Sequence, residues 1–141
     1  MQAETLGDLL REKGWEGVIG TWVDAETKGE RIKTTFSWKF KDTLLQIANK
    51  TVDRRSVSLM GRNAKTGEVY HFGADNEGGS SIGKWDEEDG VAILKLGYVM
   101  GSGVEGELII RQRFEDEDTL EVTLDVEGLE PVVFDLVRAG E

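Results

Sequence analysis

The chain contains no cysteine and a single proline, Pro131, among its 141 residues. Without cysteine it has no disulfide framework, no thiolate metal ligand and no thiol nucleophile. These absences exclude disulfide-rich scaffolds, thiolate zinc sites and thiol enzymes. A chain of this length is ordinary for one domain, so we expect a single domain over residues 1–141.

Basic residues are scarce, with 17 of them against 28 acidic ones and a formal charge of −11. Nucleic acids and anionic membranes are bound through basic surfaces, so we expect neither as a partner. No apolar run is long enough to cross a bilayer. Glu4, Asp8 and Glu12 also stand where a signal peptide would be basic and then apolar, which favours a cytoplasmic protein.

The first fifteen residues have the pattern of a short helix that caps the rest of the domain. Thr5 can cap the first turn together with Asp8, and Gly14 ends the helix. The apolar residues Leu6, Leu9 and Leu10 share one face.

Turn clusters rich in Gly, Asp, Asn and Thr then divide the chain into ten blocks that alternate between apolar and polar residues. The predicted strands are 17–24, 30–40, 43–53, 55–63, 67–75, 79–86, 90–99, 104–115, 118–127 and 131–138. The short connections leave no room for crossover helices, so the strands must be antiparallel. So much strand favours an all-β, antiparallel up-and-down barrel over residues 17–138, because closure removes exposed sheet edges.

Alternation predicts which side chains face the barrel interior. The predicted inward positions are Ile32, Thr34, Phe36, Trp38, Phe40, Leu45, Ile47, Asn49, Val57, Leu59, Leu108, Ile110, Gln112, Phe114, Val132, Phe134, Leu136 and Arg138. Strands 67–75 and 90–99 are apolar on both faces, so the pattern does not orient His71 or Lys95.

The N-terminal helix, the Gly20-Thr21-Trp22 segment of the first strand and the late Arg138 resemble the calycin group. That group comprises lipocalins, fatty-acid-binding proteins and bacterial lipocalin-like domains. The resemblance implies that Trp22 lies inside the closed end of a barrel and that Arg138 packs across it. We expect Gly20, Trp22 and Arg138 to have this structural role in barrel closure.

The inward residues allow two interpretations of the barrel interior. One is a cavity for a small, mostly apolar or weakly anionic molecule, because small barrels hold one ligand among apolar walls and a few polar groups. The candidate ligand-binding residues are Thr34, Phe36, Trp38, Ile47, Asn49, Leu59, His71, Leu108, Ile110, Gln112 and Phe114. The other is a filled core in which Thr34, Asn49 and Gln112 pair with one another or with water.

His71, the single histidine, is the only candidate for acid–base chemistry at neutral pH or for haem ligation. Haem-binding relatives of the resembled group carry their histidine near the C-terminus, unlike His71. The chain also lacks a Gly-x-Ser-x-Gly elbow, a phosphate-binding Walker loop and a cluster of histidine with carboxylates. We therefore predict a non-catalytic binding protein without metal or cofactor, with a haem or enzymatic barrel using His71 as the alternative.

Positive charge is concentrated in one part of the chain. Residues 28–65 hold ten basic and three acidic residues, a charge of +7 that leaves −18 for the rest. Lys33 and Lys39 are predicted to point outward, so the second to fourth strands form a basic face. A second alternative is an interaction module that docks an acidic partner through this face, and we expect a monomer or weak homodimer.

Overall fold

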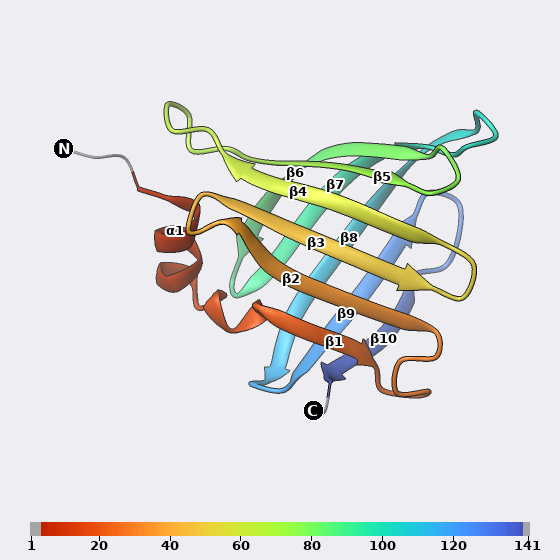
Figure 1. The fold of residues 1–141 in the computed structure, drawn as a ribbon, viewed down its shortest axis with the longest axis horizontal. Helices are drawn as coiled ribbons and strands as arrows, with labels where there is room; N and C mark the ends of the chain where they lie inside the picture. The colour runs from red at the N-terminus through yellow and green to blue at the C-terminus, as the bar shows by residue number, and fades with distance from the viewer. Residues whose placement is uncertain (1–3, 140–141) are drawn as a thin grey trace.

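Ten antiparallel strands form a closed up-and-down barrel in the computed structural model, which describes residues 4–139 (Figure 1). The strands are β1 (Gly20–Asp24), β2 (Ile32–Phe40), β3 (Leu44–Thr51), β4 (Arg55–Arg62), β5 (Val69–Asp75), β6 (Ser80–Glu88), β7 (Val91–Val99), β8 (Glu105–Asp116), β9 (Thr119–Val126) and β10 (Val132–Arg138). Each pairs with its neighbours in sequence, and β1 pairs with β10. The predicted fold class is confirmed; residues 1–3 and 140–141 of the predicted domain lie outside the described range.

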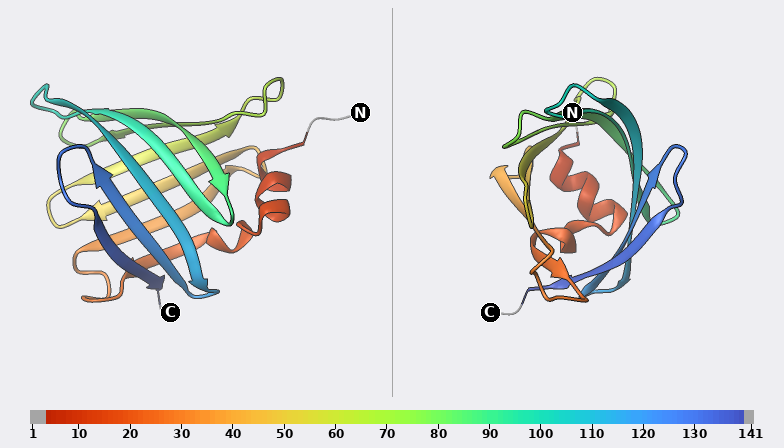
Figure 2. Two further views of the ribbon diagram at one scale, coloured as in Figure 1. Left: turned by 180° about the vertical axis from the view of Figure 1, so that it is seen from behind. Right: turned by 90° about the vertical axis from the view of Figure 1, so that its right-hand side faces the viewer.

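The helix α1 (Leu6–Lys13) and a short 3-10 turn (Glu16–Val18) cover one end of the barrel (Figure 2, right). Thr5 and Asp8 form a reciprocal capping box, and Gly14 ends the helix in the left-handed conformation. Leu6 and Leu10 are buried toward the barrel. In the described range, no helix has the length and apolar character that crossing a membrane requires.

Aromatic side chains fill the barrel end beneath this helix. Trp22 is fully buried, and its indole N–H donates to the Val18 carbonyl at 2.9 Å. The Arg138 guanidinium lies 4.4 Å from the Trp22 ring centroid, and the two residues are direct partners across the β1–β10 pairing. Phe114 packs on Trp15, with 4.8 Å between ring centroids. These contacts form an aromatic plug beside the β1–β10 seam at this end.

The predicted orientation of the β4 side chains is wrong. Val57 and Leu59 lie on the outer face, 49% and 37% exposed, whereas Ser58 and Met60 are buried inside. Burial alternates along β4 as predicted, but with the opposite phase. The sequence could not reveal this phase because the outer positions are more apolar than most of the inner ones.

The structure defines the orientations of the His71 and Lys95 side chains and corrects the predicted orientation of Phe40. His71 points inward and is buried, whereas Lys95 points outward and is exposed. Phe40, predicted inside, is 63% exposed. An irregularity in the β2–β3 register between Trp38 and Phe40 breaks the alternation before Phe40.

The Arg138 contacts predict a specific loss of stability. Replacing Arg138→Met removes the cation–π contact and the guanidinium hydrogen bonds to the carbonyls of Gly17 and Glu117. We expect the free energy of unfolding to fall by about 2 kcal/mol, measured by urea denaturation. The matched control Arg31→Met removes an exposed ion pair with Glu26 and should cost less than about 1 kcal/mol. Equal losses in the two variants would contradict this account of barrel closure.

Candidate functional site

A cavity of about 360 Å³ occupies the barrel interior and reaches the end opposite the helix. Its mouth lies among the loops that follow β3, β5 and β7, where Arg54, Asp75 and Met100 line it. Eight of the candidate ligand-binding residues line this cavity: Thr34, Phe36, Ile47, Asn49, His71, Leu108, Ile110 and Gln112. The volume is at the small end of the range for small-molecule sites.

Three candidate residues lie elsewhere. Leu59 points outward because of the reversed phase of β4. Trp38 lies near the helix end and lines a separate pocket with Leu10 and Ile19. Phe114 belongs to the aromatic plug beside Trp15. Alternation assigns a residue to a face of a strand but not to a depth along the barrel, which is why the sequence misplaced Trp38 and Phe114.

The cavity exists because its two walls differ in side-chain size. Small inward residues of β4 to β6 form one wall: Ser56, Ser58, Gly73 and Ser81. Large apolar residues of β7 to β10 form the other: Leu94, Leu96, Leu108, Ile110, Leu124 and Phe134. The small wall was not predicted, because the apolar residues of β4, Val57 and Leu59, were expected to face inward.

One polar pair lies on the cavity wall formed by β2 and β3. The Thr34 hydroxyl donates to the Asn49 side-chain carbonyl at 2.5 Å. This bond leaves the Asn49 amide NH₂ without a hydrogen-bond partner among residues 4–139. A filled core would pair Thr34, Asn49 and Gln112 with one another or with water. Thr34 and Asn49 are paired in this way, but the Asn49 amide NH₂ can still donate to a molecule in the cavity.

His71 on β5 is held in one tautomer by its neighbour on β6. The Trp85 indole N–H donates to His71 Nδ1 at 3.2 Å. An indole nitrogen can only donate, so Nδ1 must be unprotonated and the ring proton sits on Nε2. Burial lowers the pKa of His71 to about 4, which keeps the imidazole neutral at pH 7. His71 therefore presents an N–H donor, not a charge, to the cavity it lines.

Asp24 organises a loop at the open end of the barrel. Its buried carboxylate accepts from the Thr27 hydroxyl at 2.5 Å and from the backbone N–H groups of Thr27, Gly29 and Ile32 at 2.7 to 3.1 Å. These bonds, with the Thr27 hydroxyl first, lower the pKa of Asp24 strongly. This role of Asp24 was not predicted, although the sequence places an acid two residues after Trp22 on the same, inward face of the strand.

A second, smaller space of about 260 Å³ lies between the helix and the barrel. Phe36, Trp85 and Gln112 line both this space and the main cavity, so they form the partition between the two. Leu6, Leu10 and Trp15 line the helix side. Aromatic and amide side chains therefore bound the main cavity on the side that faces the helix.

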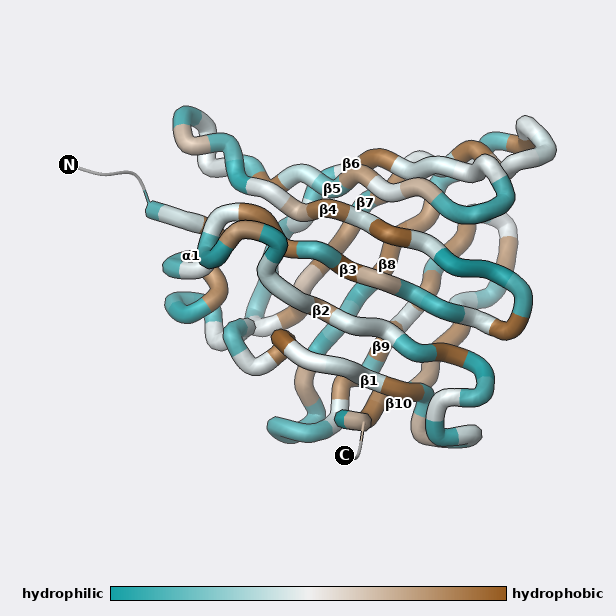
Figure 3. The backbone as a smooth tube through the Cα atoms, viewed as in Figure 1, coloured by the Kyte–Doolittle hydropathy of each residue, from teal (hydrophilic) through white to brown (hydrophobic). Residues whose placement is uncertain are grey.

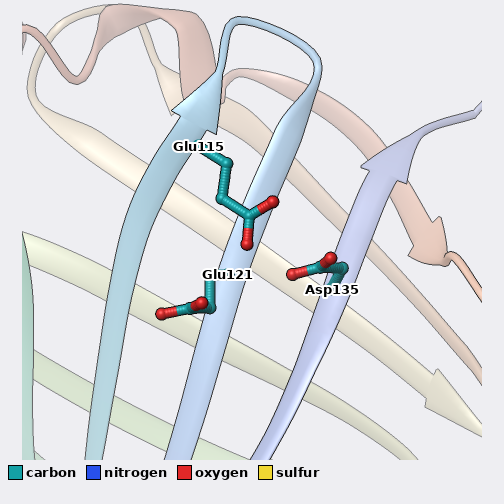
Figure 4. A group of neighbouring side chains, drawn as sticks. All are labelled: Glu115, Glu121 and Asp135. Carbon is teal, nitrogen blue, oxygen red and sulfur yellow. The ribbon is translucent and has the colours of Figure 1, made fainter.

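Three carboxylates gather outside the barrel on β8, β9 and β10 (Figure 4). The oxygen atoms of Glu115, Glu121 and Asp135 lie within 4.8 Å of one another. Arg113 pairs with Glu121 through two bonds of 2.9 and 3.1 Å, and the adjoining Asp135 carboxylate raises the pKa of Glu115. The cluster is thus partly neutralised by the protein itself and is separate from the cavity.

Comparison with known proteins finds no family model that matches this chain and no curated protein of similar sequence.

The neutral His71 predicts a particular pH dependence of stability. Its pKa is 6.5 when exposed and about 4 when folded, so the unfolded chain binds more protons between these values. Stability contributed by the neutral ring is fully present above pH 6.5 and is lost, by about 3 kcal/mol, as the pH falls to 4. His71→Gln cannot titrate, yet its amide oxygen can still accept from Trp85.

Urea unfolding at intervals between pH 7 and 4 measures this difference. The stability of the wild type should fall more steeply than that of His71→Gln, while carboxylate titration affects both proteins equally. Parallel curves would contradict a buried, neutral His71.

Proposed function

We propose that this protein binds one small, mostly apolar molecule inside the barrel and does not transform it. The observation that carries the proposal is the open cavity between the wall of small residues and the wall of large ones. Interiors of folded proteins are close-packed, and an unfilled space costs stability. A mouth opposite the closed end gives a ligand a route into this space.

The ligand we propose is uncharged. Among the described residues that line the cavity, only Arg54 and Asp75 carry formal charge at pH 7. Both lie at the mouth, where the Arg54 guanidinium is paired with Glu77 at 3.0 Å. A carboxylate deep in the cavity would find no cation, and burying an unpaired charge is costly.

One end of the ligand should carry a hydrogen-bond acceptor. His71 Nε2–H supplies one donor to the cavity, and the Trp85 contact holds the imidazole in place. The Asn49 amide is a separate donor nearer the mouth, in register with Asp75, which is four residues along β5 from His71. A carbonyl oxygen suits the His71 donor, because a neutral acceptor satisfies it without bringing in charge. We therefore propose small ketones, esters or amides with an apolar body as the ligand class.

The surroundings of His71 support binding rather than catalysis or haem ligation. A general base works best with a pKa near the operating pH, whereas the pKa of His71 is about 4. A metal-bound histidine normally donates its other ring N–H to an acceptor. In His71, by contrast, Nδ1 carries no proton and accepts a hydrogen bond from the Trp85 indole N–H. A calycin-like binding barrel is the more economical proposal.

Filling the cavity tests the proposed function. Ser58→Leu adds a large side chain to the small wall and should abolish the binding of acetophenone, a neutral aryl ketone, in isothermal titration calorimetry. The control Ser37→Leu makes the same change on β2, outside the cavity lining, and should bind like the wild type. Binding by neither the wild type nor the control, or binding unaffected by Ser58→Leu, would refute a functional cavity.

Three near-isosteric probes test the proposed acceptor. Acetophenone carries a carbonyl, α-methylstyrene replaces it with an alkene, and benzoate replaces the methyl ketone with a carboxylate. We expect acetophenone to bind most tightly and benzoate least. His71→Leu should weaken acetophenone binding about tenfold and leave α-methylstyrene unchanged, because one hydrogen bond is lost. The alkene also reports whether the variant keeps its cavity; an equal loss for both probes would contradict the role of His71.

A further inference from the structure

The outer face of β4 to β7 is unusually apolar for an exposed surface. Phe72 and Ile82 are 55% and 66% exposed, and Leu59 is the cross-strand partner of Phe72. Hydrophobic segments recur along β4 and β6 (Figure 3). The strand register places Leu59, Phe72, Ile82 and Gly97 side by side in one row across the four strands. Contiguous exposed apolar residues on a folded protein mark an interaction surface.

A depression of about 540 Å³ lies next to this row. It is bounded by Phe72, Ile82, Val99, Glu105 and Glu107, and Gly97 forms part of its floor. A Cβ at Gly97 would meet only the Ile82 carbonyl oxygen, at 3.9 Å, so the missing side chain leaves a notch. The surface therefore carries a protruding ring at Phe72 and a matching hollow at Gly97, with Ile82 between them.

Charges of opposite sign lie on the two sides, or margins, of the patch, the basic ones four residues along β4 from Leu59 and the acidic ones on β8 beside Gly97. Lys33, Lys50 and Arg55 are direct cross-strand partners on β2, β3 and β4, an arrangement that is unfavourable within one molecule. On the other margin, β8 presents Glu105 and Glu107. In the described part of the chain, none of these five residues forms an ion pair.

We infer that this surface binds a second copy of the same chain. A two-fold axis running along β6 would place Ile82 against its own counterpart. It would also bring Phe72 of each copy to Gly97 of the other, since both lie on one register row. The same rotation turns the basic margin of one copy toward the acidic margin of its partner. Such a reciprocal contact is what a two-fold homodimer requires.

Other partners fit these observations less well. The closed barrel has no free strand edge, so association by strand addition is not open to it. An acidic protein would match the basic margin but would be repelled by Glu105 and Glu107. A second copy supplies complements to the ring, the hollow and both margins at once. Because two convex barrels meet, the dimer should be weak and sensitive to salt.

Sedimentation equilibrium at low salt tests the dimer with variants that move the aromatic ring from position 72 to position 97. Phe72→Ala removes the ring and Gly97→Phe fills the hollow, so each change alone should weaken dimerisation at least tenfold. The double variant rebuilds the contact with the roles reversed and should recover most of the affinity. Val133→Ala, an exposed apolar truncation on β10 outside the patch, is the control and should leave the dimer unchanged.

Charge reversal provides an independent readout. Arg55→Glu should weaken the dimer, and adding Glu105→Lys should restore it; Lys39→Glu, toward the other end of β2, should have no effect. A wild type that stays monomeric at low salt would overturn the inference. So would single variants that dimerise like the wild type, or a ring-and-hollow double variant that recovers nothing.

Discussion

The pairing of β1 with β10 determines the architecture of the whole domain. It closes the sheet, so that every strand has two partners and each side chain belongs to an inside or an outside. Trp22 and Arg138 hold this seam at the helix end, where the guanidinium covers the indole and bonds to loop carbonyls. The Phe36, Trp85 and Gln112 side chains separate the main cavity from the space beneath the helix, so the mouth of the main cavity lies at the other end.

The two walls of the interior then decide what the space can do. Serine and glycine on β4 to β6 face leucine and isoleucine on β7 and β8. The small wall also brings polar atoms inside, and the Trp85 contact sets the His71 tautomer. The strands β4 to β6 thus supply both the small side chains that leave the cavity open and the His71 N–H that is proposed to bind a neutral acceptor.

The strand order and the helix could be predicted because they depend on local signals. Turn residues recur at regular intervals, and Thr5 with Asp8 marks the helix start. Features set by long-range packing could not be predicted. The phase of β4 depends on neighbouring strands, and it placed Leu59 outside; the depth of Trp38 along the barrel depends on the helix. The inward turn of His71 was equally undecidable, since β5 is apolar on both faces.

Native mass spectrometry of the protein purified from its own host can detect a ligand held in the barrel. We expect a one-to-one complex with a small neutral molecule that is released on denaturation and is absent from Ser58→Leu. A bare polypeptide mass for the wild type, or the same adduct on both proteins, would contradict a ligand held in the barrel cavity.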